Sequence, residues 1–189
     1  MSDAAPFNAK NPFPATICEI KPLNGAGSSK DTRHVVISLA DGGPSYEPGD
    51  SLGVLARNNP ELIASILTWL GASGDEIVTM PKGAADVPLS EALARLEISR
   101  VAKSLLQPLA AASEDETLRK VADPAEKELI SAFCDGRDLL DVLKLANPGS
   151  LEPQQLVDGL RSLLPRLYSI ASSPRVNPGQ GYFFFILFI

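Results

Sequence analysis

The chain has 189 residues, of which 44% are hydrophobic and 21% charged, and its formal net charge is −6. These proportions are typical of a globular domain and exclude wholesale disorder. The acidic balance also argues against a nucleic-acid partner, because nucleic-acid binding requires a basic patch. No apolar segment follows a positive start among residues 1–10, so we predict a flexible tail there and no secretion signal.

The two cysteines, Cys18 and Cys134, lie far apart in the sequence and belong to no Cys/His cluster. We therefore expect neither a disulfide framework nor a metal site, and we predict that both thiols pack in the core of a cytoplasmic protein. No stretch reaches the roughly 20 apolar residues that a membrane-spanning helix needs, so no membrane partner is expected.

Residues 11–58 carry the signals of β-strands. Runs of apolar and β-branched residues alternate with turns that contain Gly, Pro, Asp or Asn, which favours an antiparallel barrel or sandwich. The Gly-rich segment 24–28 lies between two such runs rather than before a helix, so we interpret it as a hairpin loop and not as a phosphate-binding loop. The expected strands are 15–20, 34–39 and 51–55.

Helical periodicity replaces the strand pattern over residues 59–164. Asn59 is suited to cap a first helix, Pro60 to begin it and Gly71 to end it. Further apolar clusters at helical spacing follow, with almost no strand signal between them, so we predict an all-helical insert. One of its helices is expected to open at Asp123–Pro124 and to bury the apolar side chains Leu129, Ile130 and Phe133.

Strand character returns at Pro165, and we assign one further strand to residues 165–178. The last segment, 179–189, ends in Y-F-F-F-I-L-F-I and lacks the period-two alternation of a half-buried strand. We interpret it as an aberrant apolar tail, of the kind left by a shifted reading frame or a broken end.

The sequence R-L-Y-S at 166–169 holds the residues best suited to a ligand. Alternate side chains of a strand share a face, so Arg166 and Tyr168 should project together. A guanidinium group binds a diphosphate through paired hydrogen bonds, and a tyrosine ring stacks on an aromatic cofactor, which together suit FAD. Ser169 could bond the edge of the ring, although a twist or a bulge would be needed to bring it to the same face.

A second interpretation of R-L-Y-S remains open. In that interpretation the segment is an ordinary barrel strand whose arginine pairs with a neighbouring carboxylate. A pattern this short does not separate the two.

Four segments, in order along the chain, resemble the FAD module of the NADPH-dependent diflavin reductase family, which includes cytochrome P450 reductase and the sulfite reductase flavoprotein. They are F-N-A-K-N-P-F, D-T-R-H, Y-E-P-G-D-S-L-G-V and L-P-R-L-Y-S-I-A-S-S, and the last is closest to the bacterial sulfite reductase flavoprotein. The resemblance implies an α+β fold: an antiparallel Greek-key flavin-binding β-barrel, incomplete here, interrupted by an all-helical connecting domain at 59–164.

The resemblance also implies which residues contact FAD. Arg166 would hold its pyrophosphate, Tyr168 would pack on the isoalloxazine ring, and Ser169 would bond near the redox-active edge. No side chain is implied as an acid–base catalyst, because the cofactor carries the chemistry. The implied cofactor-binding residues are Arg166, Leu167, Tyr168 and Ser169, together with Ser99, Gly136 and Arg137 from the helical insert.

The chemistry implied is hydride transfer from NADPH to FAD, followed by electron transfer to FMN or another acceptor. The implied partner is an FMN-carrying or acceptor redox protein, or a sulfite reductase hemoprotein. In the family an FMN domain precedes this region, and further strands and an NADPH-binding domain follow it. We therefore expect a C-terminally truncated module that alone is not competent for the full reaction. Two alternatives remain open, a non-catalytic helical interaction module and an inactive fragment.

Overall fold

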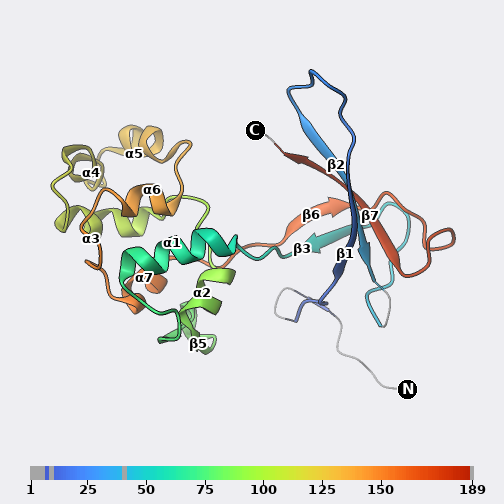
Figure 1. Ribbon diagram of the computed structural model, residues 1–189, viewed down its shortest axis with the longest axis horizontal. Helices are drawn as coiled ribbons and strands as arrows, with labels where there is room; N and C mark the ends of the chain where they lie inside the picture. Colours follow the sequence, from blue (N-terminus) through green and yellow to red (C-terminus); the bar gives the residue numbers. More distant parts are fainter. Residues whose placement is uncertain (1–6, 9–10, 40–41, 188–189) are drawn as a thin grey trace. The chain divides into compact units, whose positions relative to one another are not determined.

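The computed structural model describes residues 7–8, 11–39 and 42–187, so the flexible tail predicted at 1–10 lies almost entirely outside the described residues. The chain forms two compact units. Unit 1 consists of Met1–Leu55 and Leu164–Ile189, and unit 2 of Ala56–Leu163 (Figure 1). Helices and strands are both present, which confirms the α+β class.

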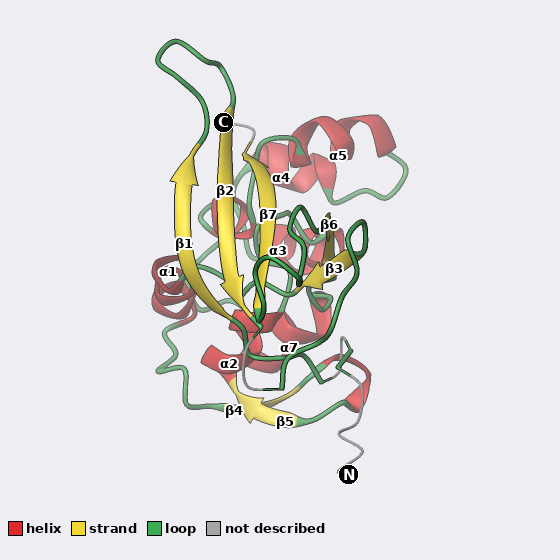
Figure 2. Ribbon diagram, turned by 90° about the vertical axis from the view of Figure 1, so that its right-hand side faces the viewer, coloured by secondary structure: helices red, strands yellow, loops and turns green. Residues whose placement is uncertain are grey.

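Unit 1 is built from β-strands, three of which lie side by side in an antiparallel sheet of order β1-β2-β7 (Figure 2). The other two, β3 and β6, form a separate antiparallel pair. The expected strands at 15–20, 34–39 and 51–55 correspond to β1, β2 and β3, and the Gly-rich segment 24–28 is the loop between β1 and β2, as predicted. The bounds are β1 Thr16–Pro22, β2 Asp31–Ser38, β3 Ser51–Val54, β6 Arg166–Ser169 and β7 Gln180–Leu187.

The segment 179–189, interpreted from the sequence as an aberrant apolar tail, forms a regular strand over residues 180–187. This segment is strand β7, and it pairs with β2 along its whole length, from Gln180 opposite Ser38 to Leu187 opposite Asp31. Alternation of apolar and polar residues is typical only of half-buried strands. The hydrogen bonds between neighbouring strands use backbone groups alone, so a segment without alternation can still pair. Aromatic and β-branched residues favour this extended backbone.

The core of unit 1 is small. Its buried side chains are Val35, Ile37, Leu39 and Ile170. Cys18 does not join them, contrary to the prediction, and is exposed. The register of β1 against β2 shifts at this point, so that Cys18 has no partner residue in β2, and the whole of β1 is largely exposed at the sheet edge.

Unit 2 is mainly helical, and its first helix begins and ends as the sequence predicts. The Asn59 side chain accepts a hydrogen bond from the backbone N–H of Glu61, Pro60 is the first helical residue, and Gly71 ends the helix with a positive φ of 70°. The α-helices are α1 Pro60–Leu70, α2 Leu89–Arg95, α3 Leu106–Ala111, α4 Glu116–Val121, α5 Lys127–Cys134, α6 Leu139–Leu143 and α7 Pro153–Gly159, with short 3-10 turns η1 Pro81–Gly83 and η2 Lys103–Leu105.

Two details of the helical prediction are wrong. The unit also contains an antiparallel hairpin, β4 Ile77–Thr79 and β5 Asp86–Pro88, which buries Val78 but is too short to give a periodic signal. Helix α5 begins at Lys127 rather than near Pro124, because residues 123–126 form a turn closed by a bond from Glu126 N–H to the Asp123 carbonyl. Leu129 is 40% exposed, contrary to the prediction, while Ile130 and Phe133 are buried.

One contiguous apolar cluster holds unit 2 together. Each fully buried leucine or isoleucine contributes about 1.5–3 kcal/mol relative to leaving it exposed. Cys134, at the end of α5, packs against this cluster in a half-buried position. No helix within the described ranges is long and apolar enough to cross a membrane. The fully buried side chains include Ile66, Leu89, Leu93, Leu96, Ile98, Leu109, Leu118, Leu139, Leu143 and Leu156.

Candidate cofactor site

Strand β6 positions the R-L-Y-S residues through its pairing with β3. Arg166 lies opposite Val54 and Tyr168 opposite Leu52, without a shift of register. Tyr168 is half-buried against the core of unit 1, and Ile170, two residues further on, is fully part of that core. Because alternate residues share a face, Arg166 and Tyr168 both lie on the core side of the strand, as the sequence predicted.

Leu167 and Ser169 lie on the opposite face of β6. Leu167 is 75% exposed and Ser169 is also exposed. The β3–β6 pairing contains no bulge, so the irregularity needed to bring Ser169 to the side of Tyr168 is not found in this strand pair. The structure therefore brings Arg166 and Tyr168 together and leaves Ser169 at the strand end, facing away from them.

The guanidinium group of Arg166 is available for a ligand. It is exposed and forms no hydrogen bond or ion pair with any residue in the described ranges. The interpretation in which this arginine pairs with a neighbouring carboxylate is thus not supported. Four other arginines do form such pairs with carboxylates, namely Arg33, Arg57, Arg95 and Arg119.

These features fit FAD on two counts. A free guanidinium group can bind a diphosphate through two charge-assisted hydrogen bonds, and a tyrosine packed on one side by the core offers a rigid ring for stacking. Gly53 contributes to the local geometry, because a Cβ at this position would lie 3.3 Å from Pro165 Cβ. The absence of a side chain there lets β3 lie close to the segment that leads into Arg166.

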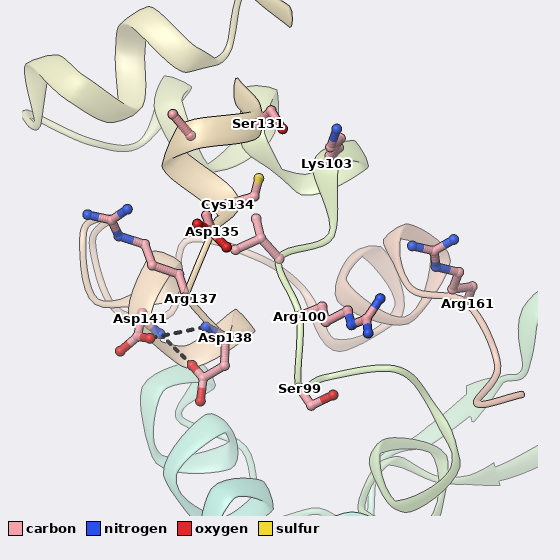
Figure 3. Close-up of a pocket in the computed structure, with 13 residues that line it drawn as sticks. Ser99, Arg100, Lys103, Ser131, Cys134, Asp135, Arg137, Asp138, Asp141 and Arg161 are labelled. Carbon is pink, nitrogen blue, oxygen red and sulfur yellow. Dashed lines mark hydrogen bonds between the residues drawn. The ribbon is translucent and has the colours of Figure 1, made fainter. Parts of the chain in front are cut away.

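The three residues expected from the helical insert, Ser99, Gly136 and Arg137, line one pocket of about 780 Å³ within unit 2 (Figure 3). Ser99 Oγ donates to Glu97 Oε1 at 2.5 Å. Gly136 adopts a positive φ of 69° in the turn after α5, a conformation that favours glycine. The three residues, which only the family resemblance had brought together, thus lie around one pocket.

Arg137 and Cys134 are fixed within this pocket by their neighbours. The Arg137 guanidinium donates to the Phe133 carbonyl at 2.6 Å and lies 4.6 Å from the centre of the Phe133 ring. Burial raises the pKa of the Cys134 thiol, and the positive charges of Lys103 and Arg137 oppose that rise. Cys134 is consequently a weakly reactive thiol.

Sequence reasoning missed three cations of the same pocket: Arg100, Lys103 and Arg161. Arg100 directly follows Ser99, so its position could have been inferred from that neighbour. Arg161 could not, because a backbone bond from Glu97 N–H to the Arg161 carbonyl, 2.8 Å long, joins segments that are far apart in the sequence.

The family model for an FAD binding domain matches residues 5–181. The chain therefore belongs to the FAD binding domain family, which confirms the resemblance and identifies FAD as the cofactor of the family.

Similar curated proteins are sulfite reductase [NADPH] flavoprotein alpha-components. That of Bacillus subtilis (strain 168) is 43% identical over 175 residues, which cover 92% of this chain and 29% of that protein. That of Pectobacterium atrosepticum is 39% identical over 171 residues, which cover 90% of this chain and 27% of that protein. That of Cronobacter sakazakii is 37% identical over 172 residues, which cover 90% of this chain and 28% of that protein. The chain spans less than a third of the length of these relatives.

Proposed function

We propose that this chain is the FAD-binding electron-transfer module of an NADPH-dependent flavoprotein reductase of the sulfite reductase type. The observation that supports it best is the pairing, on one face of β6, of a free guanidinium group at Arg166 with a partly packed ring at Tyr168. FAD, when bound, would accept a hydride from NADPH and release electrons to FMN or another acceptor. The names of the relatives support the choice of NADPH as the donor.

In this proposal each residue of β6 has a separate task. Arg166 binds the pyrophosphate through its two outer nitrogens, and Tyr168 stacks on the isoalloxazine ring. Ser169 ends the strand on the face opposite Tyr168, and its exposed hydroxyl would bond a heteroatom at the edge of the flavin ring. Leu167, whose side chain is 75% exposed on the opposite face of the strand, is proposed as a further cofactor contact.

Ser99, Gly136 and Arg137 are proposed as further cofactor contacts in unit 2. Their convergence on one pocket supports this assignment. A ligand there would meet a hydroxyl, a backbone turn without a side chain, and a guanidinium group held by its own helix end.

We assign the strands of unit 1 to an antiparallel Greek-key flavin-binding barrel and residues 59–164 to the connecting domain. Residues 165–178 would be the barrel segment that carries the FAD motif, within which the strand itself is β6, Arg166–Ser169, followed by a loop. A sulfite reductase hemoprotein or an FMN-carrying protein would receive the electrons in the cytoplasm. The alpha-component designation of the relatives supports a partner subunit.

A flavin titration of the purified 189-residue chain tests the proposal. Arg166→Gln should weaken FAD binding about 10- to 100-fold, because a hydrogen bond to a charged group contributes about 1.5–3 kcal/mol. Arg175→Gln is the matched control, since Arg175 is an exposed arginine in a loop of the same unit. Equal FAD affinity in the two variants, or no flavin binding by the unaltered chain, would contradict the proposal.

A non-catalytic interaction module remains the second candidate. The larger apolar core lies in unit 2, so this unit has the burial needed for an independent role. Flavin binding separates the candidates, because an interaction module has no requirement for Arg166 or Tyr168. An inactive fragment would bind FAD without being reduced by NADPH.

A further inference from the structure

Strand β6 has little support of its own. It is four residues long, and within the described part of the chain it pairs with β3 alone. An isolated pair of strands is only marginally stable, so the side chains that face a ligand depend on what holds the chain beyond the strand end. There, the Ile170 N–H donates to the Asp50 carbonyl at 2.8 Å. The Ala171 N–H donates to the Tyr182 carbonyl, also at 2.8 Å.

A series of hydrogen bonds fixes the next residue, Ser172, which is only 8% exposed. Its Oγ accepts from the Tyr182 N–H at 3.1 Å and lies 2.7 Å from the Tyr46 hydroxyl oxygen. The Tyr46 hydroxyl donates to the Gln180 carbonyl at 2.7 Å. Because a phenol has a single proton to donate, Tyr46 accepts from the Ser172 O–H, and each of the two hydroxyls then donates one bond and accepts one.

Tyr46 connects this hydrogen-bond series to the surroundings of Tyr168. Both tyrosines are half-buried and pack against the same core of unit 1. Leu52, which lies opposite Tyr168 in the β3–β6 pair, packs there too. A buried polar group that loses its partner costs more than an average hydrogen bond contributes. Loss of the Tyr46 hydroxyl would deprive both Ser172 and the Gln180 carbonyl of a partner, and would loosen the chain directly after β6.

We propose that Tyr46 is a positioning residue of the flavin site: its hydroxyl fixes residues 170–172 and thereby holds the Tyr168 ring in the orientation that stacks on a flavin. The proton of this hydroxyl is committed to a backbone carbonyl, so Tyr46 acts through Tyr168 and not by contact with a ligand. A ring held in place before binding loses less entropy when the flavin binds. The inference deepens the proposed function and rests on the assignment of β6 to FAD.

The test compares Tyr46→Phe with Tyr182→Phe in the full chain. Each change removes one hydroxyl from a half-buried tyrosine of unit 1, but the Tyr182 hydroxyl bonds Asn177 at 2.9 Å, and only the Tyr182 backbone takes part in the hydrogen-bond series. Tyr46→Phe should weaken FAD binding about three- to tenfold in a fluorescence-quenching titration, and Tyr182→Phe should bind FAD as the unaltered chain does. Ser172→Ala should reproduce the loss, and the double variant with Tyr46→Phe should bind little more weakly than either single variant.

Nuclear magnetic resonance of isotope-labelled tyrosine rings gives a readout without flavin. The chain has three tyrosines, so the Tyr168 signal can be assigned from its loss in Tyr168→Phe. This signal should shift and broaden in Tyr46→Phe and stay in place in Tyr182→Phe.

Two results would overturn the positioning role of Tyr46. One is an unchanged Tyr168 signal in Tyr46→Phe. The other is a lower melting temperature of Tyr46→Phe with the FAD affinity of the folded chain unaltered, which is what a merely structural role would give. An unaltered chain that binds no FAD would instead contradict the proposed function, and the Tyr168 signal would still decide whether Tyr46 holds that ring.

Discussion

Replacing Gly159 by alanine tests how tightly the end of α7 packs in unit 2. A Cβ built at this position lies 2.6 Å from Leu105 Cγ and closer still to Leu105 Cδ2. Leu105 is only 2% exposed, so its side chain is enclosed by other atoms and cannot move out into solvent. The added methyl group therefore forces the backbone or the core to shift.

Two effects of opposite sign decide the outcome of Gly159→Ala. Alanine in place of glycine favours a helix by up to about 1 kcal/mol, but Gly159 is the last residue of α7, where this gain is smallest. Overpacking in a dense core costs about 1–3 kcal/mol. We therefore expect a net loss of about 1–2 kcal/mol in the free energy of unfolding.

Denaturant unfolding followed by far-ultraviolet circular dichroism measures this loss, because the helices of the chain lie in unit 2. Gly25→Ala is the control, since a Cβ there meets no atom within 4 Å and the residue has no positive φ. Leu105→Ala alone should cost about 2–5 kcal/mol, and the double variant should cost clearly less than the sum of the two. Strict additivity, or no destabilisation by Gly159→Ala, would refute the packing argument.

Three further predictions follow from local contacts. Hydrogen bonds from the backbone N–H groups of Ser73 and Gly74 lower the pKa of the Glu76 carboxyl from 4.5 to about 2. The ionised carboxylate therefore stabilises the fold above pH 4.5, and this stabilisation is lost as the pH falls towards 2. The urea midpoint of the unaltered chain should fall over this pH range by more than the midpoint of Glu76→Gln does. Asn59→Ala removes the α1 cap and should cost about 1 kcal/mol in a thermal melt, and a shift equal to that of an exposed control such as Lys144→Ala would contradict it. A thiol reagent should modify exposed Cys18 quickly and half-buried Cys134 slowly, and Cys18→Ser should abolish the fast phase; two equal rates would count against the assigned burial.

The parts of the fold that the sequence predicts well are those with local causes. Asn59, Pro60 and Gly71 each act on the adjacent backbone, so the bounds of α1 follow from residue types alone. Strand β7 could not be predicted in the same way, because its stability depends on the free edge of β2, almost 150 residues earlier in the chain. The exposure of Cys18 similarly depends on a register shift that only the partner strand reveals.

The candidate site shows the same division. The common face of Arg166 and Tyr168 follows from the two-residue period of a strand and required no tertiary information. Arg161 of unit 2 does not follow from any local pattern, because a backbone bond from Glu97 N–H to its carbonyl, between distant segments, brings it to the pocket that Arg100 lines beside Ser99. For Ser169, the two-residue period alone predicts the face opposite Tyr168, and the regular β3–β6 register shows no bulge that would move it.

The most direct test of the central claim is whether this chain binds a flavin ring at Tyr168. Quenching of FAD fluorescence on titration with the chain measures it, with Tyr168→Phe and Tyr168→Ala as a matched pair. We predict that Tyr168→Phe, which keeps the ring, binds FAD nearly as well as the unaltered chain. Tyr168→Ala should weaken binding by tenfold or more, because it loses both the aromatic pair, which contributes about 0.5–1.5 kcal/mol, and the apolar area that the ring buries, at about 25 cal/mol per Å². Equal quenching by all three proteins would contradict a flavin site on β6.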